Sequence, residues 1–235
     1  MTRGSGSKSV TPNVYATQAS GLCTFSWKIF CCEGTSNFLH IPKTGGTWFR
    51  ELVHATGPNN HAYTIENIDT SVVFILRDPI ERFLSALRHV FQHHNGQELG
   101  SLSIDNCITE YRKHGHPNHH FFDTISETWL ANFKQHEHKI MRVFDFSSLK
   151  DSVLQMMPYL EEELLINTPL NVTNNNFIGI GPSAISNDNL NWMQNKFKKD
   201  IELCSYIKQQ PYFSRCMCGV IHASDSTCFI KGCKC

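Results

Sequence analysis

Short apolar runs alternate along this chain with longer segments in which apolar residues recur at helical spacing. The runs 37–41 and 72–76 have the length and composition of buried strands, and 139–144 is a third candidate. After the second run, Phe83, Leu87 and their neighbours repeat every three or four residues, as on one face of a helix. Strands that alternate with helices predict an α/β fold with a mostly parallel central sheet flanked by helices on both faces.

Glycine, proline and serine residues mark where the predicted helices begin. A helix follows Gly45 and Gly46 at once, and Thr47 can serve as its N-cap. Pro79 lies near the start of the next helix, and the serine pair 147–148 can cap a later one. The first predicted strand and its helix are therefore joined by a glycine turn.

The remaining segments have weaker patterns. The stretch 91–120 is polar and rich in histidine, which predicts a long surface excursion. Helical spacing returns at 125–133, and 187–208 is predicted to form one long final helix. No segment repeats another, and the length of 235 residues suits a single α/β domain with short extensions.

We divide the chain into a flexible lead-in at 1–35, a globular domain at 36–210 and a cysteine-rich tail at 211–235. There are 21 basic and 21 acidic residues, and a net charge of zero gives no support for a nucleic-acid or membrane-surface partner. Any recognition of an anion must therefore be local. No apolar stretch approaches the roughly 20 residues that span a bilayer, so we expect no transmembrane segment in this chain.

Two clusters contain residue types that can bind metals. Histidines crowd 114–120, where a solvated loop is the simpler interpretation and zinc the alternative. In the tail, disulfide bonds and a zinc site both remain open. Neither cluster is expected to take part in the chemistry, so we assign no metal ligand. The tail cysteines are Cys216, Cys218, Cys228, Cys233 and Cys235.

The strongest local signal is the segment 40–48, with the sequence HIPKTGGTW. It joins a strand to a helix through a glycine turn, and backbone N–H groups in such turns converge on phosphate or sulfate oxygens. Gly45 and Gly46 let the backbone approach an anion closely, and Lys43 adds a mobile charge. A plain glycine turn would not need the lysine before the pair or the threonine after it. The segment is not a Walker A loop, because there the lysine follows the last glycine.

The second signal is the segment 76–85, with the sequence LRDPIERFLS. Arg77 directly follows a buried strand, and open α/β sheets bind their ligands at the carboxyl ends of strands. A guanidinium group there, with the Ser85 hydroxyl two turns along the next helix, suits a phosphate monoester. The alternative is that Arg77 pairs with Asp78 or Glu81 at the start of that helix.

Together the two segments are far more specific. HIPKTGGTWF and LRDPIERFLSALRH resemble the two binding elements for 3′-phosphoadenosine-5′-phosphosulfate (PAPS) in the Golgi carbohydrate sulfotransferases. The second is especially similar to that of the heparan sulfate 6-O-sulfotransferases, and weaker similarity extends over about residues 36–208. The resemblance implies a P-loop-like sulfotransferase fold. It also implies transfer of a sulfuryl group from PAPS to an acceptor hydroxyl, most often on a glycan, with no metal required.

The resemblance assigns roles to residues by position. In this family the first element holds the 5′-phosphosulfate and the second holds the 3′-phosphate. Arg77 and Ser85 correspond to the 3′-phosphate ligands, and Lys43 is expected also to stabilise charge on the leaving phosphate oxygen. The residues that correspond to the 5′ site are Lys43, Thr44, Gly45, Gly46, Thr47 and Trp48.

In-line sulfuryl transfer also needs a base for the hydroxyl proton. Histidine suits this role because its pKa lies near working pH. His61 lies between the two elements, in the region where related enzymes carry their catalytic histidine, and is our candidate. His54 is an alternative that can instead pack on the first helix, His40 is expected to shape the glycine turn, and Glu51 is a further option.

Two other functions remain open from the sequence. A P-loop-like nucleotide kinase would need the Gly-Lys-Ser/Thr order and a Mg²⁺-binding aspartate after a strand, neither of which is evident. A non-catalytic nucleotide-binding module would keep the pocket without turnover. The intact set of Lys43, Arg77 and Ser85 argues against a decayed site.

Overall fold

The computed structural model describes residues 24–29, 32–53, 55, 61–94, 103–115, 121–156 and 185–213. Within these residues the strands form one sheet in the order β1-β2-β3-β4. β2, β3 and β4 run parallel, whereas β1 pairs antiparallel with β2. The strands are β1 (Thr24–Ile29), β2 (Cys32–Leu39), β3 (Val72–Leu76) and β4 (Ile140–Asp145). The expected α/β class is confirmed in this form: a small parallel sheet flanked by helices.

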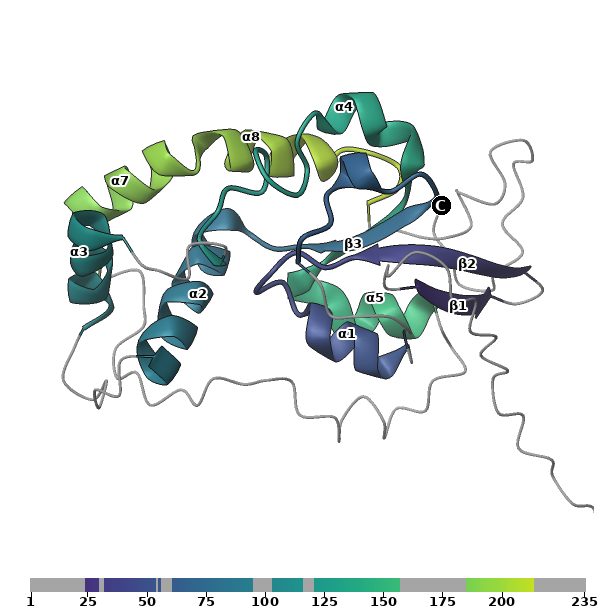
Figure 1. The fold of residues 1–235 in the computed structure, drawn as a ribbon, viewed down its shortest axis with the longest axis horizontal. Helices are drawn as coiled ribbons and strands as arrows, with labels where there is room; N and C mark the ends of the chain where they lie inside the picture. Colours follow the sequence, from purple (N-terminus) through teal and green to yellow (C-terminus); the bar gives the residue numbers. More distant parts are fainter. Residues whose placement is uncertain are drawn as a thin grey trace, which may run out of the picture.

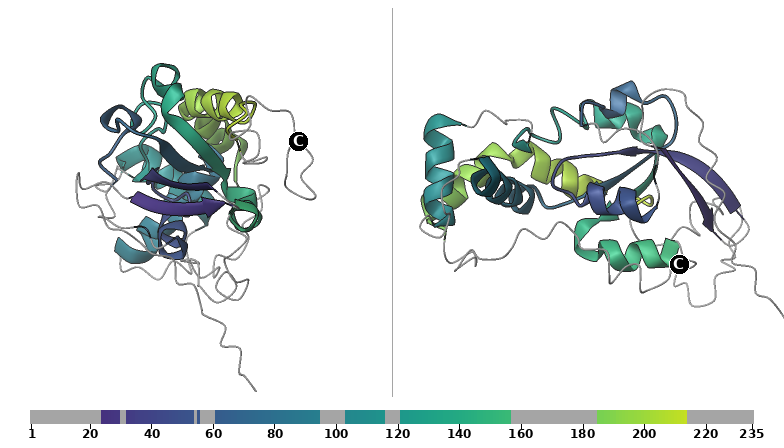
Figure 2. Two further views of the ribbon diagram at one scale, coloured as in Figure 1. Left: turned by 90° about the vertical axis from the view of Figure 1, so that its right-hand side faces the viewer. Right: turned by 60° about the horizontal axis from the view of Figure 1, so that its bottom comes forward.

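Helices lie on both sides of the sheet (Figures 1 and 2). α1 and α5 lie on one side, α4 and α8 lie on the other, and α2, α3 and α7 gather at the end away from the β1–β2 hairpin. The helices are α1 (Gly46–Leu52), α2 (Pro79–His94), α3 (Ile104–His114), α4 (Phe133–His136), α5 (Leu149–Met156), α7 (Asn187–Lys196) and α8 (Lys198–Ile207).

Side chains of β3 alternate between two apolar clusters, one on each face of the sheet. Val73 and Ile75 pack in the cluster that contains Leu52 of α1. Phe74 points to the opposite face, into the cluster that contains Ile207 of α8. Because helices cover both faces, every residue of β3 is buried, which explains its uninterrupted apolar sequence.

A buried polar clamp ties the segment after α3 to two helices. Arg82 of α2 is fully buried and donates hydrogen bonds to the carbonyl oxygens of Phe121 and Asp123. The Asp200 carboxylate of α8, also fully buried, accepts from the backbone N–H groups of Ile125 and Ser126 at 2.8 and 2.9 Å. Burial lowers the pKa of Arg82 to about 10, and the nearby charge of Asp200 opposes that shift. The clamp therefore stabilises two opposite charges inside the apolar core.

Several predicted elements have the expected positions. β3 has the bounds predicted for it, α2 begins at Pro79, and β4 is offset by one residue from 139–144. The N-cap of α1 is Gly45 rather than Thr47, which lies within the first turn of the helix. The serine pair 147–148 does not cap α5 directly but belongs to a 3₁₀ turn, Phe146–Ser148, that precedes it.

Other predictions were wrong. The stretch 91–120 is not one surface excursion, because α2 continues to His94 and α3 occupies Ile104–His114. The sequence hides α3 because its buried side is narrow and the rest of its surface is polar. Segment 125–133 consists mainly of turns, and the expected final helix is interrupted at Phe197 into α7 and α8.

The sheet begins earlier in the chain than the predicted domain boundary. β1 and the start of β2 lie within 1–35, so the sheet begins before the domain boundary placed at residue 36. The side chains that follow Ser36 in β2 are buried, as in a core strand. Among the helices of the described ranges, none has the length and apolar character to cross a bilayer.

The clamp gives a prediction for stability. Asp200→Asn should lower the free energy of unfolding by about 2–4 kcal/mol, because the change leaves Arg82 buried without its compensating charge. Urea unfolding followed by circular dichroism measures this. Asp188→Asn is the matched control: Asp188 pairs with Arg112 at 2.5 Å, but its side chain is 81% exposed, so its loss should be much smaller. Equal losses for the two variants would contradict the assignment.

Candidate functional site

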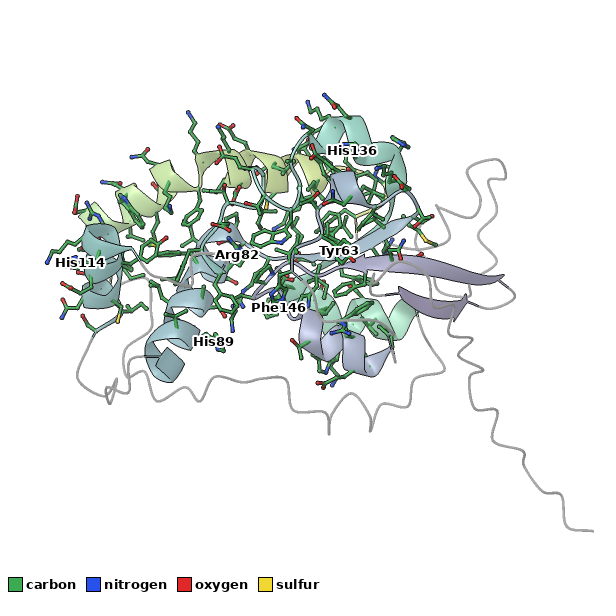
Figure 3. The ribbon with its side chains drawn as sticks, in the orientation of Figure 1. Tyr63, Arg82, His89, His114, His136 and Phe146 are labelled. Carbon is green, nitrogen blue, oxygen red and sulfur yellow. The ribbon has the colours of Figure 1, made fainter. Side chains whose placement is uncertain are left out.

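The carboxyl ends of the three parallel strands meet at one edge of the sheet. Arg77, directly after β3, donates a hydrogen bond from Nη1 to the carbonyl oxygen of Lys43, in the loop after β2, at 3.2 Å. Its guanidinium carbon lies 4.1 Å from the ring centroid of Phe146, which follows β4. Figure 3 shows Phe146 close to the start of α1. The two sequence motifs are thus in direct contact at the edge where open α/β sheets bind ligands.

The loop after β2 has an unusual backbone. Lys43 has φ 64°, which is uncommon for a residue with a side chain, and Gly45 has φ 86°. The Thr44 side chain is fully buried, and its hydroxyl donates to the carbonyl oxygen of Ile41 at 2.8 Å. The Thr44 hydroxyl therefore holds the loop, and only its backbone N–H remains for a ligand.

Gly46 is required because the His40 ring leaves no room for a side chain at this position. A Cβ at this position would lie 2.2 Å from Cδ2 and 2.4 Å from Nε2 of the His40 ring. His40 itself is only 5% exposed. The structure thus places His40 against the glycine turn, where the sequence analysis expected it to shape the loop.

Lys43 is the flexible cation of the loop. Burial, together with the charge of Arg77, lowers its pKa from its ordinary value to about 8. An anion bound between the two residues would relieve this repulsion. The two cations are therefore held close together at a free-energy cost that a negative ligand can offset.

Arg77 has partners on three sides. Besides Lys43 and Phe146, it forms an ion pair with Glu81, with Nε 3.7 Å from Oε2. Its side chain is 16% exposed, and burial is the main cause that lowers its pKa. The Asp78 carboxylate instead accepts from the N–H groups of Ile80 and Glu81, both at 3.0 Å. Both interpretations of Arg77 thus have support: it touches the loop of the first motif, and it also pairs with Glu81.

One face of α2 extends the site away from the strand. Glu81, Ser85 and Arg88 are spaced by four and three residues, so their side chains lie in one stripe along the helix. Ser85 is half-buried. Arg88 was not singled out from the sequence, although its spacing from Ser85 is a signal that could have found it. Its Nε is buried and has no hydrogen-bond partner, and burial lowers its pKa.

His61 lies beside the loop. The centroid of its ring is 4.4 Å from that of His40, in an edge-on arrangement. Its carbonyl oxygen accepts a hydrogen bond from the Trp129 indole at 2.8 Å, which fixes the backbone. The Phe121 ring lies 6.4 Å from His61 and 5.3 Å from His89, which is labelled on α2 in Figure 3. The His40 ring thus lies between His61, the candidate base, and the glycine turn.

The other candidate residues are placed differently. Glu51 is exposed near the end of α1, and His54 lies outside the described residues. Thr47 is half-buried in the first turn of α1. Trp48 is 5% exposed and packs in the apolar cluster beneath the sheet, so its ring belongs to the core.

The two clusters of potential metal ligands are mostly outside the described residues. His114 is exposed at the end of α3, whereas 116–120 and the cysteines from 216 onward are not described. Within the described ranges, no group of three or more His, Cys, Asp or Glu side chains is arranged to hold a metal ion.

Comparison with known proteins adds no relative. No protein-family model matches the chain, and neither a curated protein nor a solved structure matches it significantly.

The contact between His40 and Gly46 gives a second prediction. Gly46→Ala should lower the free energy of unfolding by about 1–3 kcal/mol, because the new methyl group overlaps the His40 ring. In a His40→Ala background the same change should cost much less, because the ring is gone. Urea unfolding of the two single variants and the double variant measures this coupling. An equal cost of Gly46→Ala in both backgrounds would show that the ring is not the obstacle.

Proposed function

We propose that this protein is a PAPS-dependent sulfotransferase that transfers a sulfuryl group to an acceptor hydroxyl, with a carbohydrate as the acceptor that the motif resemblance favours. The observation that carries the proposal is the hydrogen bond between Arg77 and the Lys43 carbonyl oxygen. It supports the proposal because both motifs must face one site if they are to hold the two phosphate-bearing ends of one nucleotide.

The loop has features that fit the 5′-phosphosulfate. Gly45 adopts a left-handed conformation against the Phe146 ring, and Gly46 lies against the His40 ring, so only glycine fits at either position and the turn keeps the tight shape that an anion-binding loop needs. Lys43 would contribute charge to the same anion. Arg77 and Ser85 would hold the 3′-phosphate on the adjacent helix face, where a guanidinium fork and a hydroxyl match its oxygens.

When bound, PAPS would supply the sulfuryl group, and 3′-phosphoadenosine-5′-phosphate would be the leaving group. Lys43 would stabilise negative charge on the leaving oxygen, and its position next to Arg77 keeps positive charge concentrated there. His61 would accept the proton of the acceptor hydroxyl at a ring nitrogen. The Trp129 hydrogen bond to its carbonyl oxygen and the neighbouring His40 ring restrict the place of His61 beside the loop.

The kinase alternative has less support. Lys43 precedes both glycines, which is not the order of a phosphate-binding Walker A loop. Asp78, the carboxylate that follows β3, accepts two backbone N–H groups at the start of α2. This capping role explains Asp78 without a Mg²⁺ ion.

Nucleotide binding tests the proposal. The protein should bind 3′-phosphoadenosine-5′-phosphate (PAP), which carries both phosphates, at least about tenfold more tightly than ATP, because Arg77 and Ser85 would bind the 3′-phosphate that ATP lacks. Isothermal titration calorimetry at one fixed salt concentration measures both affinities. Tighter binding of ATP, or no binding of PAP, would refute the proposal.

Turnover tests the role of His61. With radiolabelled PAPS and a panel of glycan, peptide and small-molecule acceptors, His61→Ala should lower kcat by about 100-fold or more, while the Kd for PAP changes little. His136→Ala is the matched control, because His136 lies on α4 (Figure 3) and not at the loop. If His61→Ala keeps near-normal turnover, another group is the base.

A further inference from the structure

Arg88 is a half-buried cation that the proposed reaction leaves without a role. Its Nε has no hydrogen-bond partner, although an unpaired buried donor of a charged group is costly. The side chain is half-buried on α2, on the same stripe as Ser85 and Glu81. Among the described residues no hydrogen bond is found at that nitrogen, and the same holds for Nε of Arg77, the other arginine of the site.

Helix geometry shows where Arg88 points. Long side chains on a helix lean toward its N-terminus and cover the preceding turn, and for Arg88 that turn is the one that contains Ser85. Its electrostatic neighbours agree with this direction. The charge of Arg88 acts on Arg77, and the charge of Glu81 acts on both arginines. Arg77 and Arg88 therefore approach Ser85 from opposite ends of the stripe.

Glu81 is the carboxylate of this group. Its Oε2 lies 3.7 Å from Nε of Arg77, and its side chain is 63% exposed, so it can swing into solvent at little cost. Asp78, whose charge also acts on Arg77, is held by two backbone N–H groups at the start of α2, so Glu81 is the mobile carboxylate beside the two guanidinium groups. A phosphate monoester, which carries a charge of about −1.5 to −2 near neutral pH, matches two guanidinium groups better than one carboxylate does.

We propose that Arg88 is a third ligand of the 3′-phosphate, opposite Arg77 across Ser85, and that this phosphate takes the place of the Glu81 carboxylate beside the two arginines. This inference rests on the proposed function, because it assigns an additional ligand to the same donor site. It makes the site specific for nucleotides with a 3′-phosphate over those that carry phosphate at the 5′ position alone.

The experiment compares PAP with adenosine 5′-phosphosulfate, which has no 3′-phosphate, by isothermal titration calorimetry at one salt concentration. Arg88→Gln should weaken PAP binding by about 10- to 100-fold and change adenosine 5′-phosphosulfate binding less than about threefold. Glu81→Gln should tighten PAP binding alone, because the competing carboxylate is removed. Arg112→Gln, an arginine on α3 that pairs with Asp188, is the matched control and should change neither affinity.

The outcomes separate this inference from the proposed function. If the unmodified protein binds PAP no better than adenosine 5′-phosphosulfate, the proposed function fails. If it discriminates between them and Arg88→Gln discriminates equally well, or weakens both ligands alike, the role of Arg88 is overturned and the proposed function stands. Thermal unfolding checks that each variant is folded. If Arg88→Gln does not fold, PAP binding is measured with Arg88→Lys and Glu81→Gln instead. Unchanged PAP affinity in both variants overturns the inference.

Discussion

The packing of Arg77 at the carboxyl edge of the sheet is the constraint on which the site depends. Its guanidinium group hydrogen-bonds the loop after β2 and stacks on Phe146 after β4, while its own backbone ends β3. One side chain thus links the ends of all three parallel strands. The left-handed backbone of Lys43 is held in place by this hydrogen bond, since such strain persists only where the surroundings determine it.

The framework behind this edge is made rigid by different means. Apolar clusters on both faces of the sheet fix the strands, and the clamp of Arg82 and Asp200 fixes the segment that brings Phe121 and Trp129 to His61. The position of the candidate base therefore depends on buried charges that reach it through Trp129 and Phe121. The same segment thus contributes to the buried clamp and to the position of His61.

The sequence predicted those parts of the fold that local patterns specify. The uniform apolar run of β3 and the Pro79 start of α2 were found because both signals are contained in a few neighbouring residues. α3 was missed because its buried side is narrow, and the break at Phe197 was not foreseen because Phe197 packs in the cluster shared by α2, α3 and α7. β1 was also missed, because its sequence mixes apolar and polar residues and its pairing with β2 is a matter of backbone hydrogen bonds.

The candidate site likewise has parts that the sequence predicts and parts that it does not. That the loop of Lys43 lies next to Arg77 follows from topology, because parallel strands end at a common edge, and this much was predictable. Phe146 could not be assigned from the sequence, since nothing local shows that it packs on Arg77. The burial of Thr44 and Trp48, which leaves them as parts of the scaffold, likewise depends on long-range packing.

The lowered pKa of Lys43 has a consequence for the solution chemistry of the protein. With a pKa of about 8, Lys43 is about one-tenth neutral at pH 7, whereas an ordinary lysine is almost wholly charged. An anion that settles beside it favours the charged form and draws a fraction of a proton out of the buffer. The heat released on binding such an anion would then vary with the ionisation enthalpy of the buffer, because the loop would take up protons as the anion binds.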